Sequence, residues 1–135
     1  MTPDTTLEQQ GQKTLQNPSP IEVEAALRQI DPQHRSYLIL NRPDDSYIQV
    51  AGSRLKLTIE FREVQGDSFH HYVLGRFPTE SRQVVISCSC GPITVQRNEV
   101  LLIEDAVRVA KEFMESGRVP EEYALRDVTG MFDRE

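Results

Sequence analysis

The hydrophobic and polar positions divide the chain into a helical segment, a series of strand-like runs and a second helical segment. The first apolar stripe consists of Val23, Ala26, Leu27 and Ile30. Its i, i+3, i+4, i+7 spacing predicts a short helix with one buried side. Ser19 can cap the N-terminus of this helix, with Pro20 in its first turn and Glu22 completing a capping box. Asp31-Pro32 is expected to end it.

Between residues 36 and 96 the pattern changes to short apolar runs separated by turn residues, which is typical of strands. The clearest run is Leu55–Val64. In it, Leu55, Leu57, Ile59 and Phe61 face one way, and Lys56, Thr58, Glu60 and Arg62 face the other. Such alternation indicates antiparallel pairing in a sheet with one solvated face. The other expected strands are Ser36–Leu40, Tyr47–Ala51, His70–Phe77, Gln83–Ser87 and Ile93–Gln96, with Tyr123–Asp127 as a last short extended piece.

The strongest periodicity lies between Ile103 and Gly117, where apolar residues recur at steps of three and four. This stripe predicts a helix that lies across the apolar face of the sheet. Gly117 can adopt the left-handed conformation that ends a helix, and Pro120 prevents its continuation. The predicted fold is therefore α+β: an antiparallel β meander of about five or six strands, packed against a long C-terminal helix, with a short N-terminal helix.

The ends of the chain lack this periodicity. Residues 1–16 are rich in Thr and Gln and predict a flexible leader. Residues 17–128 are expected to form one domain, and residues 129–135 a frayed tail. With 135 residues, 38% apolar and 27% charged, the composition is that of a globular protein. We find no apolar run of about 20 residues and no secretory signal, so we expect a cytoplasmic protein that does not enter a membrane.

The net charge of −6 is concentrated in the last part of the chain. Residues 99–135 contain ten acidic and five basic residues. This balance argues against non-specific binding of nucleic acid, which needs a surplus of Lys and Arg. It would suit a basic protein partner through complementary pairing. The alternative is that the acidic residues only keep helix surfaces soluble.

Two short motifs could in principle bind zinc: Cys88-Ser89-Cys90 and His70-His71. Adjacent residues on a strand point to opposite faces, so the two histidines are not expected to share a metal ion. A single C-x-C pair also lacks the paired spacing of zinc fingers and ribbons. We therefore expect no metal and no cofactor. The cysteines are expected to be small buried residues in a reducing setting.

Motifs for catalysis are missing as well. The chain has no G-x-S-x-G elbow, no glycine-rich phosphate loop and no H-E-x-x-H. The carboxylate pairs Asp44-Asp45, Glu104-Asp105 and Glu121-Glu122 are typical of solvated turns and helix surfaces. We expect no catalytic residues and no enzyme. A catalytic Cys working with His70 or His71 stays open as an alternative, because such groups assemble in space.

The order of these features resembles immunity protein family 1 over roughly residues 17–127. The chain has the Asn17-Pro18-Ser19 start with its capped helix, then the sheet, then a late helix. The phrase that ends this helix reads Glu112-Phe113-Met114-Glu115-Ser116-Gly117-Arg118-Val119-Pro120. Such proteins tend to carry a Trp shortly after the Pro, whereas this chain has Tyr123 and Leu125 there.

The resemblance implies an antidote made beside a polymorphic bacterial toxin, often one with a nucleic-acid deaminase domain. It implies that the antidote binds the toxin in the producing cell and keeps it from nucleic acid. An acidic protein can occupy the basic substrate groove of such a toxin. Another cytoplasmic binding module, such as a secretion chaperone or adaptor, is the alternative function.

The candidate toxin-binding residues come from three places in the sequence. The polar side of the clearest strand supplies Lys56, Glu60 and Arg62, and the preceding turn supplies Asp44, Asp45 and Tyr47. The acidic C-terminal segment supplies Glu121, Glu122 and Tyr123. For each of them the alternative is a plain solvated surface residue. The expected partner is the cognate toxin domain; the oligomeric state stays open, with a monomer assumed.

Overall fold

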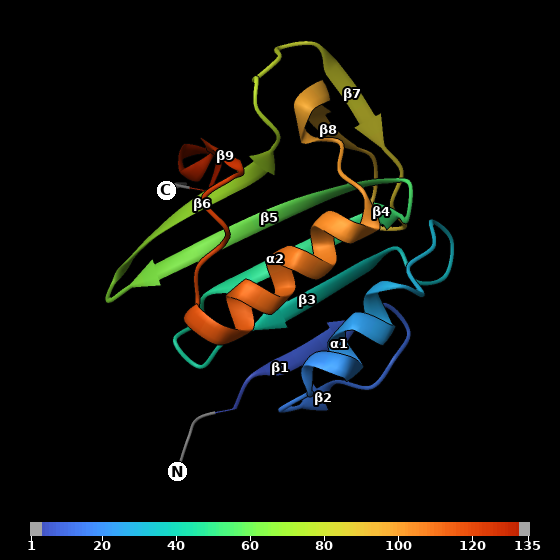
Figure 1. Cartoon of the computed structure of the whole chain (residues 1–135), viewed down its shortest axis with the longest axis vertical. Coiled ribbons are helices and arrows are strands. Elements are labelled where there is room, and N and C mark those ends of the chain that lie inside the picture. Colours follow the sequence, from blue (N-terminus) through green and yellow to red (C-terminus); the bar gives the residue numbers. More distant parts are fainter. Residues whose placement is uncertain (1–3, 133–135) are drawn as a thin grey trace.

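The structure of the protein is a computed structural model that describes residues 4–132. The strands are β1 (Thr6–Gln9), β2 (Leu15–Gln16), β3 (Tyr37–Asn41), β4 (Tyr47–Ser53), β5 (Lys56–Gln65), β6 (Ser68–Gly75), β7 (Gln83–Ile86), β8 (Ile93–Gln96) and β9 (Ala124–Asp127). The helices are α1 (Pro20–Leu27) and α2 (Ile103–Ser116), with short 3₁₀ turns η1 (Arg97–Glu99) and η2 (Thr129–Met131). Figure 1 shows both α-helices on one face of a large sheet.

The predicted α+β class is confirmed, but its details differ. Seven strands form one antiparallel sheet in the order β2-β1-β3-β4-β5-β6-β9, and β7 and β8 form a separate hairpin. The part of the chain from residue 4 to residue 132 thus holds nine strands rather than five or six. The C-terminal helix α2 has 14 residues and is not long. Neither α1 nor α2 has the length and apolarity needed to cross a bilayer.

The prediction of a flexible leader is wrong for the described residues before Asn17. Strand β1 pairs antiparallel with β3 and lies inside the sheet, and β2 pairs with β1. Leu7 is completely buried in the core. The sequence gives no pattern for this strand, because a four-residue strand needs only one large apolar side chain on its core side, and a single apolar residue shows no alternation. The expected frayed tail is also wrong for Thr129–Met131, which form η2; residues 133–135 lie outside the described part.

Replacing Leu7 by Ala is expected to lower the free energy of unfolding by about 2–4 kcal/mol, because it leaves a cavity in the core. Leu15→Ala, at a residue that is 37% exposed in the neighbouring strand β2, is the matched control and should cost well under that amount. Urea denaturation of the two variants measures the difference. Equal small losses would mean that the first 16 residues are a leader after all.

Both helices begin where the sequence predicts, and α2 also ends there, but α1 ends at Leu27, before Ile30 and the expected stop at Asp31-Pro32. The Ser19 hydroxyl accepts the Glu22 N–H at 3.1 Å, and the Glu22 carboxylate accepts the Ser19 N–H at 2.9 Å, so the capping box of α1 is confirmed. Helix α2 ends at Gly117, whose φ of 76° is the expected left-handed conformation. At the N-terminus of α2, the Asp105 carboxylate accepts the Leu102 N–H at 2.9 Å.

The main core lies between the sheet and the two helices. Leu57, Ile59 and Phe61 of β5 point into it, as predicted, and Phe113 of α2 packs edge-on against Phe61. Leu55 differs from its prediction, since it lies in the β4–β5 turn and is 80% exposed. These contacts place α2 across the sheet and leave the opposite face free of helices.

The helix-free face is not fully solvated, contrary to expectation. The β7–β8 hairpin packs over one end of it and forms a second, smaller core. This core contains Val73, Ile86, Val95 and Val128. Thr58, expected on the solvated side of β5, is 1% exposed. Gly52 is required beneath the hairpin, because a Cβ there would lie 2.9 Å from the Ile86 side chain, and its φ is 125°.

Candidate functional site

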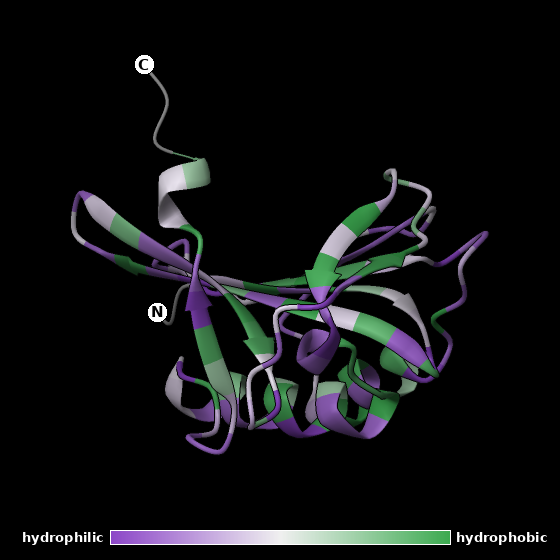
Figure 2. Ribbon diagram, turned by 90° about the horizontal axis from the view of Figure 1, so that it is seen from above, coloured by the Kyte–Doolittle hydropathy of each residue, from purple (hydrophilic) through white to green (hydrophobic). Residues whose placement is uncertain are grey.

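We call the sheet face opposite α1 and α2 the open face. Two rows of paired residues cross it. The first row is Glu8, Ile39, Gln49, Glu60 and Val73, and the second is Thr6, Asn41, Tyr47, Arg62 and His71. Figure 2 shows the helices along one side of the sheet, while the β7–β8 hairpin and the C-terminal η2 turn rise from the other. The open face therefore forms a floor between the β7–β8 hairpin and η2, which we call the two raised arms.

Arg62 is the centre of an aromatic cluster on this face. Its guanidinium carbon lies 4.0 Å from the centre of the Phe69 ring, 4.7 Å from that of Phe132 and 5.4 Å from that of Tyr47. Each of these contacts attracts the cation to the negative ring face. Burial raises the pKa of the Tyr47 phenol, so this side chain stays neutral at physiological pH. The cluster holds one cation and three rings in a defined arrangement.

His71 connects Arg62 to Glu60 beneath this cluster. The Arg62 Nε–H donates to His71 Nδ1 at 3.0 Å, and His71 Nε2 lies 2.6 Å from a carboxylate oxygen of Glu60. Because Nδ1 accepts a hydrogen bond, Nε2 carries the proton and donates to Glu60. The imidazole is 1% exposed, and the His71 backbone N–H donates to the Thr129 hydroxyl at 2.8 Å. This chain of hydrogen bonds fixes the directions of both charged side chains.

A shallow depression of about 640 Å³ lies beside the cluster, toward the N-terminal part of the sheet. Its lining combines apolar and amide groups: Gln10, Tyr37, Ile39, Gln49, Ser89 and Cys90. It contains aromatic, aliphatic and hydrogen-bonding groups without a net charge. Such a mixed surface is typical of the central part of a protein-binding site.

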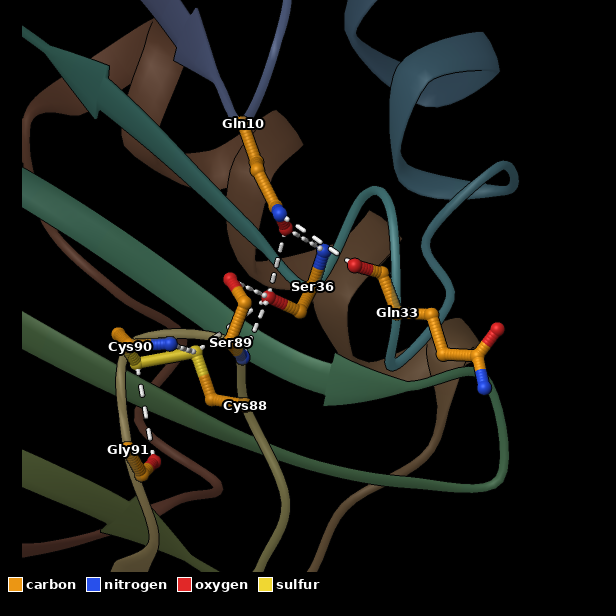
Figure 3. Close-up of a disulfide and its surroundings, with 7 residues drawn as sticks. All are labelled: Gln10, Gln33, Ser36, Cys88, Ser89, Cys90 and Gly91. Atoms are coloured by element: carbon orange, nitrogen blue, oxygen red, sulfur yellow. Dashed lines mark hydrogen bonds between the residues drawn. A yellow bond between two sulfur atoms is a disulfide. The ribbon is translucent and has the colours of Figure 1, made fainter.

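The loop after β7 borders this depression and contains a disulfide between Cys88 and Cys90. Cys90 is exposed and Cys88 is half-buried, so the expectation of two small buried cysteines is wrong. Figure 3 shows Ser36, just before β3, pointing at this loop. The Ser36 hydroxyl lies 2.7 Å from the Ser89 hydroxyl and accepts the Ser89 N–H at 3.0 Å. The loop is thus attached to the sheet.

The predicted binding residues do not form one surface. Tyr47, Glu60 and Arg62 lie together on the open face. Asp44 and Asp45 are exposed in the β3–β4 turn, near the same end of the sheet. Lys56 is exposed at the other end of β5, where it pairs with Ser53.

The three residues from the C-terminal segment lie elsewhere. Glu121 and Glu122 are exposed beside α2, where Glu122 pairs with Arg108. Tyr123 is 6% exposed, and its hydroxyl donates to the Asp105 carboxylate at 2.7 Å. Its burial and this hydrogen bond raise its pKa well above the ordinary value. Tyr123 is therefore a core residue, and the prediction that it contacts a partner is corrected.

Replacing Tyr123 by Phe is expected to lower the free energy of unfolding by about 1–2 kcal/mol, because Asp105 loses a buried hydrogen bond. It should also change the pH dependence. The folded protein keeps the Tyr123 proton above pH 10, whereas the unfolded chain loses it, so wild-type stability falls as the pH rises above about 10. The variant should fall less steeply in urea titrations between pH 9 and 11. An unchanged slope would contradict the shifted Tyr123 pKa.

Sequence reasoning missed the residues that support Arg62. From the sequence, His71 is a possible zinc ligand or partner of a catalytic Cys, not a support for Arg62; its strand position does place it on the opposite side from the exposed His70. Phe132 and Thr129 lie in the predicted frayed tail, yet both contact His71. Gln10 was assigned to the leader. Alternation along β6 separates His71 from His70 and Tyr72, but only the pairing register with β5 places it beside Arg62.

Comparisons of the chain with protein-family models, with curated proteins and with solved structures find no match. Among residues 4–132 no three His, Cys, Asp or Glu side chains gather closely enough to hold a metal ion.

Proposed function

We propose that this protein is an immunity protein that binds a cognate polymorphic toxin in the cytoplasm of the producing bacterium and neutralises it. The observation that carries this proposal is the arrangement of Tyr47, Glu60 and Arg62. Three residues that were predicted from the sequence as toxin contacts lie together on the open face, between two raised arms. Their position supports the proposal that the open face, with a raised arm on each side, receives part of a partner protein.

The fixed geometry of the cluster supports tight binding. Ordering a long side chain such as Arg at an interface costs about 0.5–1.5 kcal/mol. Arg62 is already ordered in the folded protein, so binding does not include this cost. Tyr and Arg are also the residue types that most often dominate binding energy. An antidote needs such affinity, since a small amount of free toxin is harmful, and nanomolar binding corresponds to about −12 kcal/mol.

The charge of the chain supports a basic partner. The net charge is −6, and the open face contributes the carboxylates of Glu8 and Glu60. A toxin that modifies nucleic acid, for example a deaminase, has a basic groove that these groups complement. On this proposal the antidote covers that groove or its rim.

The test is co-expression with the toxin domain encoded by the adjacent reading frame. Cells that carry both proteins are expected to survive, and the two proteins are expected to co-purify. Equal death with and without this protein, together with failure to co-purify, would contradict the proposal. Binding of a secreted protein that lacks toxin activity would instead favour the adaptor function.

A further inference from the structure

We propose that the Cys88–Cys90 disulfide is a site of thiol–disulfide exchange, in which a small thiol such as glutathione attacks the Cys90 sulfur and Cys88 leaves as the thiolate. This activity is separate from toxin binding and does not depend on it. The inference rests on the access to the two sulfurs, on the donors around Cys88 and on the local nature of the bond.

The two sulfurs differ in their access to solvent. Cys90 is exposed and lines the depression on the open face, together with Ser89. Cys88 is half-buried on the side toward Ser36. Exchange needs an incoming thiolate in line with the disulfide bond, and the choice of the attacked sulfur depends on access. Space for a small thiol is present at Cys90, because the depression measures about 640 Å³.

The leaving sulfur has hydrogen-bond donors in place. The Cys90 backbone N–H donates to Cys88 Sγ at 3.1 Å, and the Ser36 hydroxyl lies 3.5 Å from it. In the disulfide form the single Ser36 hydroxyl proton has another acceptor, the Gln10 amide oxygen at 2.8 Å. That oxygen also accepts the Ser36 backbone N–H at 2.8 Å, so it keeps a partner when the hydroxyl turns to the sulfur. A thiolate attracts such donors more strongly than a disulfide sulfur does.

The bond contributes little to holding the fold together. It links residues only two positions apart, and closing so short a loop removes little entropy from the unfolded chain. The loop has another attachment, since Ser89 is hydrogen-bonded to Ser36, and its turn is closed by the Gly91 N–H, which donates to the Cys88 carbonyl at 3.0 Å. The hydrogen bonds between Ser36 and Ser89 (Figure 3) can therefore hold the loop in position when the disulfide opens.

The reaction balances with glutathione as the reductant. The glutathione thiolate forms a bond to Cys90 Sγ, the bond between the two cysteines breaks, and its electron pair remains on Cys88. A second glutathione thiolate then attacks the glutathione sulfur of the mixed disulfide, which releases oxidised glutathione and the Cys90 thiolate. The two thiolates take protons from water. Two glutathione molecules are oxidised and one protein disulfide is reduced.

The test treats the native full-length protein with reduced glutathione, blocks free thiols with iodoacetamide and locates both labels by fragmentation mass spectrometry. The expected intermediate carries glutathione on Cys90 and the alkyl group on Cys88. Glutathione on Cys88 instead, or reduction only after denaturation, would overturn the proposal.

A second measurement tests the donor to the leaving sulfur. Ser36→Ala is expected to slow reduction by about fivefold, as the loss of one hydrogen bond implies. Ser46→Ala is the matched control, because Ser46 is also buried but lies in the β3–β4 turn and bonds to Val64. Equal rates of reduction in the two variants would show that the Ser36 hydroxyl does not stabilise the leaving sulfur. If Ser36→Ala does not fold, the label positions in the wild-type protein decide the outcome.

Discussion

Replacing Phe113 by Ala is expected to lower the free energy of unfolding by about 3–5 kcal/mol. Phe113 is the largest fully buried side chain of α2, and its ring lies 6.0 Å from that of Phe61, measured between ring centres. The guanidinium of Arg42 lies 5.8 Å from the same ring centre, on the side of the β3–β4 turn. Truncation removes the contacts that attach the helix to the middle of the sheet. Because small domains are stable by only about 5–15 kcal/mol, this loss is a large part of the total.

Urea denaturation followed by circular dichroism measures this change. Phe77→Ala is the matched control, since Phe77 has the same side chain but is 65% exposed in the loop after β6. The control is expected to stay within about 0.5 kcal/mol of the wild type. A loss at Phe113 no larger than at Phe77 would mean that α2 does not pack on the sheet as described.

Replacing Arg62 by Ala is expected to weaken toxin binding by about 2 kcal/mol or more, which corresponds to roughly thirtyfold in Kd. The substitution removes the cation that organises Tyr47 and Phe69, and it leaves His71 Nδ1 without its donor. Both the anchor and the fixed geometry around it are lost. Calorimetric titration with the purified toxin domain gives the affinity, and co-expression gives the protection of cells.

Two further variants separate binding from folding. Arg118→Ala changes an exposed Arg beyond α2, on the far side from the open face, and is expected to bind normally. Gln49→Arg places a charge on the floor of the depression, opposite Glu60 across the β4–β5 pair, and should weaken binding while the unfolding transition stays unchanged. Full affinity in both Arg62→Ala and Gln49→Arg would exclude the open face as the toxin-binding surface.

The elements with long periodic patterns could be predicted from the sequence. Helix α2 has four turns of regular apolar spacing and a glycine at its end, and β5 has strict alternation. The local sequence pattern is therefore sufficient to predict both elements. Strands β1 and β2 have no such pattern. Their residues become part of the sheet because β3 offers a free edge to pair with and because Leu7 fills a space in the core. Contacts of that kind depend on the whole fold and leave no local signal.

The candidate site was predictable only in part. Alternation places Glu60 and Arg62 on one side of β5, and this holds. The arrangement that gives them a role depends on the pairing register of β5 with β6, which brings His71 beside Arg62, and on the return of Phe132 from the far end of the chain. Neither relation can be read from spacing along the sequence. The disulfide was not predicted, for a different reason. It joins two residues only two positions apart, within a single turn.

The short strands at the two sides of the large sheet have a consequence for the protein at high concentration. Strand β2 has only two residues, and β9 has four, with Arg126 held by the buried carboxylate of Glu99. Edge-to-edge addition of a second sheet needs a long row of free backbone donors and acceptors. The edges formed by β2 and β9 present few free backbone donors and acceptors. Copies that accumulate in a crowded cell would therefore form few hydrogen bonds by joining into larger β-assemblies.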